Sequence, residues 1–319
     1  MSETDRSLFV LGGTGFIGRH LIPEAVAAGW TVHALTRRPG AVAELTALGA
    51  HPVVGDARDS SSWAGHVAQA DGVIDLTQPP VPARLTRRAL RSMAQARLAT
   101  ARVVGDAVTA AGAAHPLLIL ASGADDLAPD DAGTLSHRSG LASRPRGFGH
   151  IGIPVRRRLE QDEVEATYVY FGNVVYGPGK AYLDTIVTGL RTGRTMVIGN
   201  GSNRLPLTHV QDAAAALVHI AGLPRRQQVG ATFVAVPRTS VTQRELLDAT
   251  ADAIGARRPS SAPVALAALV AGAGNAEVMT LDATCDPTAL EATGFRFRHP
   301  DLSTGIPAAL PTAPHGDTA

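Results

Sequence analysis

Residues 10–21 read VLGGTGFIGRHL, and this stretch points most directly to the fold. An aliphatic run predicts a strand just before it, and residues 16–29 continue with apolar positions at helical spacing. Gly12, Gly15 and Gly18 are spaced GxxGxxG. Glycines allow a sharp turn and a close approach of backbone to a pyrophosphate, while the first N–H groups of the helix remain free to bind it. The stretch therefore predicts a dinucleotide-binding turn at the first strand–helix junction.

The rest of the first half alternates short aliphatic runs with longer Ala-rich helical patterns. Strand, helix and strand in repetition predict a parallel sheet that is covered on both faces. The expected strands are TVHALTR (31–37), HPVVGD (51–56), GVIDLTQ (72–78), PLLILASG (116–123) and ATYVYFGNVVYG (166–177). The fold class predicted is α/β: a Rossmann-like, doubly wound parallel sheet with a smaller C-terminal substrate-binding lobe.

The pattern loosens after about residue 176, which suggests a division of the chain. We expect a dinucleotide-binding Rossmann domain over residues 1–175, which also receives a later segment around 205–236. Residues 176–310 would form mainly the substrate-binding lobe. The Pro/Ala/Gly-rich tail, 311–319, is expected to fray.

Composition excludes several classes of function. The net charge of +1 gives no electrostatic basis for binding nucleic acid or an anionic membrane, and the histidines lack metal-site spacing. The single Cys285 excludes an internal disulfide and fits a reducing compartment. The N-terminus lacks the pattern of a signal peptide, and the apolar run 262–274 is too short to cross a bilayer and predicts a buried helix. We expect a cytoplasmic monomer or homodimer that acts on a small molecule.

Two arginines end the second expected strand. An acidic residue at this place accepts a hydrogen bond from the ribose 2′-hydroxyl of NAD, whereas an arginine pairs with the 2′-phosphate of NADP. This chain has Arg37 and Arg38 there. The sequence therefore favours NADP(H) over NAD(H), with two solvated arginines at a strand end as the alternative.

The order of the motifs resembles the extended short-chain dehydrogenase/reductase family, the NAD(P)-dependent epimerase/dehydratase-like group. GGTGFIG, VVGDARD, DGVIDLTQPP, FGNVVYGPG, RLPLTHVQDAAAAL and GFRFRHPDLSTGIPAAL are similar to its motifs and cover nearly the whole chain. The resemblance implies that Asp56 and Ala57 lie beside the adenine and that Leu76, Thr77 and Gln78 lie along the cofactor. In the turn, the residues expected to bind the cofactor are Gly12, Thr14, Gly15, Phe16, Ile17 and Gly18.

The resemblance fails at the catalytic motif. The family has a Ser or Thr after the fifth strand, which Ser122 matches, and then Tyr-x-x-x-Lys at the start of the next long helix. Here that helix start reads GFGHIGIPVRRRLEQ, without Tyr or Lys. Tyr176 and Lys180 are four apart but enclose Gly-Pro-Gly, which does not hold a helical turn, so we do not assign them the catalytic role.

Other residues are candidates for the chemistry. His150 is the titratable residue nearest to the missing Tyr, so Ser122 and His150 are the predicted catalytic residues, with polar surface as the alternative for His150. Asn173 and Lys180 are predicted to face the substrate. His209 and Asp212 are expected to cap and position a helix.

The predicted function is an NADP(H)-dependent oxidoreductase or epimerase-type enzyme for a small organic molecule, with specialised-metabolite tailoring as one setting. Two alternatives stay open because the Tyr–Lys pair is missing. One is an enzyme of the same descent without net redox, such as an isomerase, dehydratase or cyclase. The other is a non-catalytic NADP(H)-binding regulator.

Overall fold

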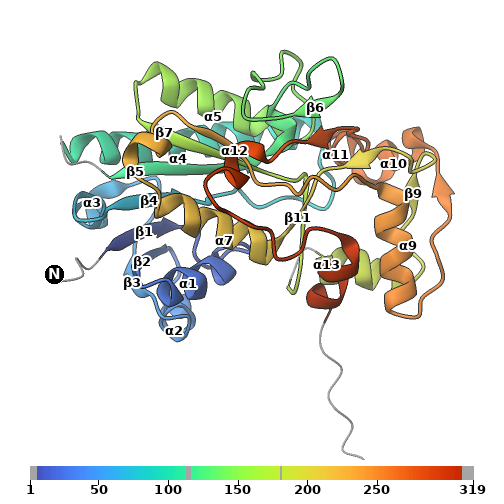
Figure 1. Cartoon of the computed structure of the whole chain (residues 1–319), viewed down its shortest axis with the longest axis horizontal. Coiled ribbons are helices and arrows are strands. Elements are labelled where there is room, and N and C mark those ends of the chain that lie inside the picture. Colours follow the sequence, from blue (N-terminus) through green and yellow to red (C-terminus); the bar gives the residue numbers. More distant parts are fainter. Residues whose placement is uncertain (1–5, 113–115, 180–181, 311–319) are drawn as a thin grey trace, which may run out of the picture.

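The computed structural model describes residues 6–112, 116–179 and 182–310. The predicted frayed tail and Lys180 lie outside the described residues. A seven-stranded sheet forms the centre, in the order β12-β7-β5-β4-β1-β2-β3, with every neighbouring pair parallel (Figure 1). Its strands are β1 (Ser7–Leu11), β2 (Thr31–Thr36), β3 (His51–Val54), β4 (Gly72–Asp75), β5 (Leu117–Gly123), β7 (Ala166–Phe171) and β12 (Thr232–Val234). The predicted doubly wound fold is confirmed.

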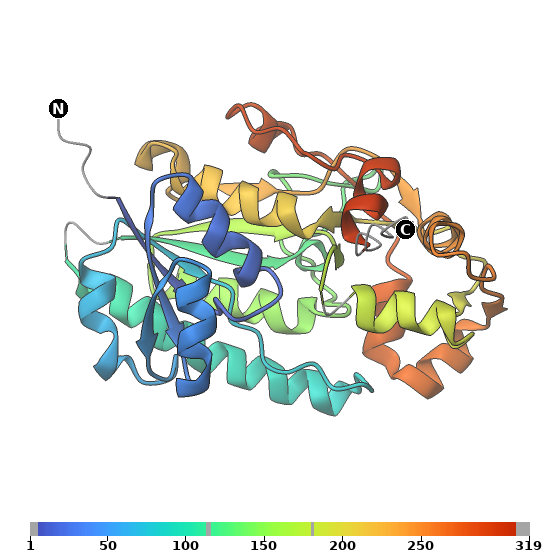
Figure 2. The ribbon, with the colours of Figure 1, turned by 90° about the horizontal axis from the view of Figure 1, so that it is seen from below.

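Helices cover both faces of this sheet (Figures 1 and 2). One face packs against α1 (Gly18–Ala27), α2 (Val42–Ala47) and α7 (Val210–Ala221), whose apolar residues form one continuous core with the strands. The opposite face packs against α3 (Ala64–Ala68), α4 (Arg87–Ala110) and α5 (Gly149–Gln161). Because both faces are buried, the strands are apolar on both sides, as the continuous run Leu117–Leu120 shows.

The expected long strand 166–177 is two strands. The chain leaves the central sheet at Gly172, and β8 (Val174–Tyr176) pairs instead with β11 (Leu207–His209). The backbone N–H of Gly172 donates to the hydroxyl of Thr208 at 2.8 Å, and a Cβ at Gly172 would overlap the carbonyl of Pro206. At this close backbone crossing the chain leaves the sheet, at the carboxyl end of β7.

A smaller part lies beyond the carboxyl ends of the strands, on the right of Figure 1. It contains α9 (Gln243–Ala253), α10 (Val264–Ala271), α11 (Ala273–Met279) and α13 (Leu302–Ala309), and Tyr182, Leu205 and Leu246 belong to its core. The division of the chain into two domains stays a prediction. The remaining strands and α-helices are β6 (Thr134–Leu135), β9 (Val197–Ile198), β10 (Arg204–Leu205), β13 (Val241–Thr242), β14 (Ser261–Ala262), β15 (Thr284–Cys285), α6 (Thr188–Arg191), α8 (Arg225–Gln228) and α12 (Thr288–Glu291). Three short 3₁₀ helices (Pro39–Ala41, Ser60–Ser62 and Ala124–Asp126) and a π-helix (Tyr182–Val187) complete the described elements.

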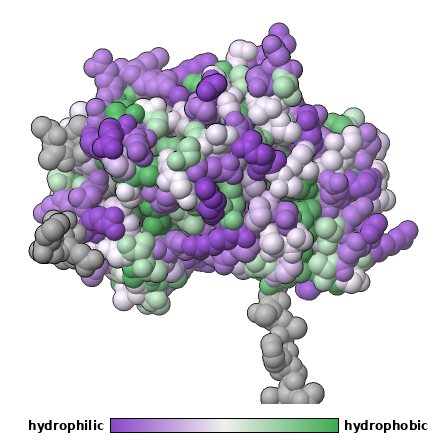
Figure 3. All heavy atoms as spheres, viewed as in Figure 1, coloured by the Kyte–Doolittle hydropathy of each residue, from purple (hydrophilic) through white to green (hydrophobic). Residues whose placement is uncertain are grey.

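The prediction of a buried helix over 262–274 is wrong. The segment forms α10 and the start of α11, and Leu269 and Val270 are 67% and 69% exposed. The break falls at Gly272, whose φ is +92° and where a Cβ would overlap the backbone of Leu85. Figure 3 shows that the face of Figure 1 is mainly hydrophilic, with hydrophobic residues in small separate areas. None of the helices in the described segments is long and apolar enough to cross a membrane.

A buried carboxylate ties the C-terminal segment to α7. Asp212 accepts backbone N–H bonds from Arg298 at 2.7 Å and His299 at 3.0 Å, and Arg298 also pairs with Glu24 on α1. The ring nitrogen Nδ1 of His209 accepts from the N–H of Gln211 at 3.3 Å, so His209 caps α7 as expected. Asp212, by contrast, does not cap α7, and its carboxylate accepts instead from backbone N–H groups of a segment 86 residues away in the chain.

Replacing Asp212 with Ala tests this connection. Two backbone N–H groups would lose a charged acceptor, so the free energy of unfolding should fall by about 1.5–3 kcal/mol. Urea denaturation followed by circular dichroism measures the change, and Asp131→Ala, at an exposed position, serves as the control. A loss in Asp212→Ala no greater than in the control would contradict the assignment.

Candidate active site

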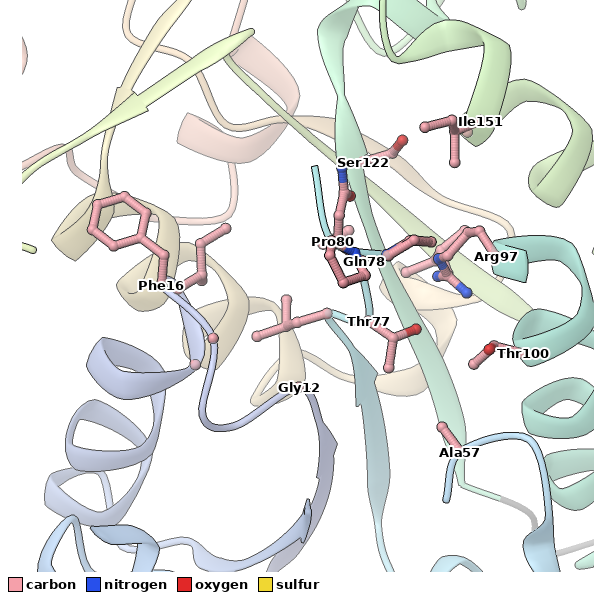
Figure 4. A pocket seen from close by; sticks show the side chains of 18 of the residues that line it. Gly12, Phe16, Ala57, Thr77, Gln78, Pro80, Arg97, Thr100, Ser122 and Ile151 are labelled. Carbon is pink, nitrogen blue, oxygen red and sulfur yellow. The ribbon is translucent and has the colours of Figure 1, made fainter. Parts of the chain in front are cut away.

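A cavity of about 670 Å³ opens at the carboxyl ends of the central strands (Figure 4). It lies where the strand order reverses, since the chain runs from β1 outward to β2 on one side and to β4 on the other. Ligands of open α/β sheets bind at this switch point, and the volume is typical of a small-molecule site. Figure 4 shows Phe16 on one side of the cavity and Arg97, Thr100 and Ile151 on the other.

The glycine turn lines the cavity with its backbone, because a side chain has no room at Gly12 or Gly18. Gly12 has a φ of +86°, and a Cβ on it would lie 2.9 Å from the carbonyl oxygen of Leu76. A Cβ on Gly18 would overlap the carbonyl oxygen of Gly12 and lie 2.7 Å from the Cα of Gly13. Helix α1 therefore starts directly against the turn, with its first N–H groups beside the cavity, as pyrophosphate binding requires.

All of the residues predicted to bind the cofactor line the cavity, and so do Ser122 and Asn173. Lys180 lies outside the described residues, so its predicted contact stays a prediction. The lining residues drawn from the predicted cofactor set are Gly12, Thr14, Gly15, Phe16, Ile17, Gly18, Arg37, Arg38, Asp56, Ala57, Leu76, Thr77 and Gln78.

One end of the cavity is positively charged. Arg37 and Arg38 are exposed at the end of β2, and Arg58 lines the same end. Asp56 is held by Arg58 through a hydrogen bond of 2.7 Å from Nη2 to Oδ2, and this bond lowers the pKa of Asp56 to about 2. Arg37 contributes to the same shift through its charge. Sequence analysis missed Arg58, although it stands within the VVGDARD motif.

A buried ion pair supports the middle of the cavity. Nη2 of Arg97, on α4, lies 2.8 Å from Oδ2 of Asp75 at the end of β4, and their side chains are 6% and 0% exposed. Thr77 donates both its N–H and its hydroxyl to the other oxygen of Asp75, at 2.9 and 2.6 Å. Nη1 of Arg97 is buried without a hydrogen-bond partner in the described chain, so the cavity wall holds an unsatisfied donor. The sequence prediction did not include Arg97, although an arginine on the apolar face of a long predicted helix could have indicated a buried charge.

The far end of the cavity combines polar groups with an apolar wall. Both polar side-chain atoms of Asn173 are buried and have no hydrogen-bond partner among the residues described, as expected for a group that awaits a ligand. The hydroxyl of Ser122 donates to Oδ2 of Asp126 at 2.6 Å. Ile151 and Val155 of α5 line the cavity on the apolar side.

Phe148 and Gly152 lie at the start of α5, the helix at whose start the family has its reactive pair. They stand four residues apart at the start of α5, and both line the cavity. A Tyr-x-x-x-Lys motif at this helix start would place its two side chains on this same face. The face of α5 toward the cavity thus presents an aromatic ring without a hydroxyl at Phe148 and no side chain at Gly152.

His150 lies outside the cavity that its predicted catalytic role requires. Its Nε2 is 3.8 Å from Oε2 of Glu277, and its side chain is 39% exposed. Successive helix residues are separated by about 100°, so His150, two positions after Phe148, points to the opposite side of the helix. Tyr176 is also outside the cavity, buried against Tyr182 in the smaller part.

The first half of the chain matches a known protein family. Residues 12–169 fit the family model described as NAD(P)H-binding. This segment belongs to that family. It contains the glycine turn, the arginine-rich end of the cavity and the Phe148–Gly152 face.

Several relatives extend the likeness over nearly the whole chain. The bovine epimerase family protein SDR39U1 is 25% identical over 314 residues, which are 94% of this chain and 98% of that protein. The crystal structure of human SDR39U1 with NADPH has a TM-score of 0.75 at 22% identity and covers 95% of this chain and 98% of its own. The UDP-glucose 4-epimerase of Thermus thermophilus with NAD has a TM-score of 0.75 at 17% identity, over 95% and 97%. The fold is that of the extended short-chain dehydrogenase/reductase group, which confirms the resemblance.

Substituting Gly18 with Ala tests the packing of the turn. The new Cβ would meet backbone atoms that cannot move independently, so we expect the free energy of unfolding to fall by about 1–3 kcal/mol and NADPH binding to weaken. Gly65→Ala is the matched control, since Gly65 is also helical and a Cβ there would have nothing within 4 Å. Thermal unfolding and a fluorescence titration measure the two effects. Equal behaviour of the two variants would contradict the close contact.

Proposed function

We propose that the protein binds NADP(H) and transfers hydride to or from a small organic molecule. One observation carries the proposal: a single cavity joins the glycine turn, the arginine-rich end and a far end with the Ser122 hydroxyl and the unpartnered amide of Asn173. The dinucleotide would occupy the first two regions, and its nicotinamide would reach the third. A bound nicotinamide supplies or accepts the hydride, and the protein provides orientation and polar contacts.

The choice of NADP(H) over NAD(H) is supported by charge. Arg37, Arg38 and Arg58 converge on the end of the cavity next to Ala57, where the adenine ribose is expected. The carboxylate of Asp56, which could otherwise accept from a ribose hydroxyl, is already occupied by Arg58. Guanidinium groups bind phosphate oxygens with charge-assisted hydrogen bonds. The presence of NADPH in the structure of human SDR39U1 supports the same choice.

The far end of the cavity is suited to a substrate with a carbonyl or hydroxyl group. Ser122 and Asn173 offer a hydroxyl, an amide N–H and an amide oxygen that together orient such a group. Phe148, Ile151 and Val155 form an apolar wall that excludes water. A mainly apolar substrate that carries a single carbonyl or hydroxyl group fits this arrangement best.

A second candidate function is an enzyme without net redox, such as an isomerase or an epimerase that recycles its cofactor. The face of α5 with Phe148 and Gly152 favours it, because the usual Tyr–Lys pair is replaced there. A panel of carbonyl compounds, assayed for NADPH oxidation, tests the first function. Turnover that continues with a redox-inactive NADP analogue would support an activity that needs no hydride transfer.

Replacing Arg37 with Ala tests the cofactor choice. Loss of a charged hydrogen bond to the 2′-phosphate should cost about 1.5–3 kcal/mol of NADPH binding free energy, while NADH affinity should stay the same. Calorimetric titration measures both dissociation constants. Arg157→Ala, on the exposed side of α5, is the control and should leave both unchanged. An unaltered ratio of NADPH to NADH affinity in Arg37→Ala would refute the assignment.

A further inference from the structure

Because Gly152 has no side chain, the carboxyl group of Asp126 can lie directly beside α5. A Cβ at this position would overlap both carboxyl oxygens of Asp126 and the hydroxyl of Ser122. The space beside α5 that a longer side chain would need is therefore filled from the opposite side, by a carboxyl group of the 3₁₀ turn Ala124–Asp126 that follows β5. A titratable carboxyl group thus lies where a side chain at position 152 would lie.

Asp126 is connected to the cavity only through Ser122. Its carboxyl group is buried, with the whole residue 1% exposed, and it is absent from the cavity lining that Ser122 and Asp125 belong to. Oδ2 accepts from the Ser122 hydroxyl at 2.6 Å, whereas Oδ1 is buried with no hydrogen-bond partner in the described part of the chain. One oxygen thus contacts the hydroxyl that faces the substrate.

The neighbouring acid differs in its contacts. Oδ2 of Asp125 accepts from the backbone N–H groups of Phe148 at 2.6 Å and Gly149 at 3.2 Å, at the start of α5. Such N–H groups stabilise a carboxylate. Asp125 is therefore the member of the pair that carries the negative charge, and Asp126, with a single hydroxyl partner, is the member that holds a proton.

The other charged groups near Asp126 have their own partners. Arg156, on α5, donates to Glu160 at 2.8 Å and to the Tyr170 hydroxyl of β7 at 2.9 Å. Arg97 is paired with Asp75. Burial raises the pKa of Asp126 well above its usual value, and the charge of Asp125 raises it further, against the smaller opposing effects of Ser122, Arg156 and Arg97.

We propose that Asp126 is the proton reservoir of the active site and delivers its proton to the substrate oxygen through the hydroxyl of Ser122. The inference rests on the proposed reductase function and takes NADPH as the hydride source. Asp126 is a positioning and proton-supplying residue, since only Ser122 would touch the substrate. The pair does the work that a Tyr–Lys motif does elsewhere in the fold.

The step balances in the direction of reduction. Hydride addition forms the new C–H bond at the carbonyl carbon, and the π electron pair of the C=O bond moves onto the oxygen. When the substrate binds, the Ser122 hydroxyl turns from Asp126 to the substrate oxygen, and the protonated Oδ2 of Asp126 then donates to Ser122 Oγ across the same contact of 2.6 Å. The substrate oxygen takes the proton of Ser122, and Ser122 Oγ takes the proton of Asp126. The products are an alcohol, NADP⁺ and the Asp126 carboxylate, which solvent protonates again after product release. Oxidation is the same sequence in reverse.

Asp126→Asn is the decisive variant, because it keeps the shape and the hydrogen bond to Ser122 but removes the acidic proton. In the wild type, kcat for reduction of the best carbonyl compound of the panel should fall as the pH rises through the raised pKa of Asp126. The variant should lose this alkaline decline, with kcat lowered about 100-fold, the lower range for general acid catalysis. Asp131→Asn, at an exposed position in the following loop, should match the wild type.

Asp125→Asn should shift the pH dependence of kcat, whereas Asp126→Asn should abolish it. Removal of the neighbouring negative charge lowers the pKa of Asp126, so the alkaline decline should move to lower pH instead of vanishing. A structural role for the acid pair would reduce activity in both variants without moving the pH profile. Circular dichroism and the Kd for NADPH, each unchanged within twofold, show that both variants remain folded and bind the cofactor.

Infrared spectroscopy of the protein alone provides a measurement that needs no substrate. At neutral pH the wild type should show the C=O stretch of a buried carboxylic acid, which Asp126→Asn removes and Ser122→Ala shifts. Absence of such a band overturns the inference, as does an Asp126→Asn variant that retains the kcat and the alkaline decline of the wild type. A wild type that shows the band but fails to bind NADPH would refute the proposed function, not the protonation of Asp126.

Discussion

The contact between Gly18 and the backbone of Gly12 and Gly13 is the constraint on which the other features depend. It brings the start of α1 against the end of β1, while the carbonyl of Leu76 closes on Gly12 from the neighbouring strand β4. Three segments meet at one point without a side chain between them. The cavity begins there, and Asp75, directly before Leu76, lies at the right depth for its ion pair with Arg97.

The sequence was most informative where function depends on local chain geometry. The glycine turn and the residues just after β2 and β4 each stand directly after a strand. Their side chains therefore face the same edge of the sheet, and the predicted cofactor residues line the cavity. Arg97, Phe148 and Asp126 could not be placed in this way, because their positions depend on how α4, α5 and a 3₁₀ turn pack together. For His150, proximity in sequence to the motif was misleading, since a shift of two positions along a helix changes the face.

The site combines buried charges that are compensated in different ways. Arg97 and Asp75 form a pair, and removal of either member would leave an uncompensated ion in the interior. Asp125 is compensated by backbone N–H groups at the start of a helix, whereas Asp126 has only a hydroxyl. Arrangements of this kind cost stability, and proteins retain them mostly at functional sites. The helix start with Phe148 and Gly152 therefore lies beside two buried acids, Asp125 and Asp126.

The junction of Asp212 with Arg298 and His299 also has a consequence for biosynthesis. Arg298 pairs with Glu24, a residue of the first helix, across 274 positions of the chain. During translation, α1 can meet α7 only after residues 210–221 have been made, and the salt bridge of Glu24 with Arg298 forms later still. Long-range closures of this type slow folding and leave apolar surface uncovered for longer. The apolar face of α1 that packs against α7 therefore stays uncovered in the nascent chain until α7 has left the ribosome.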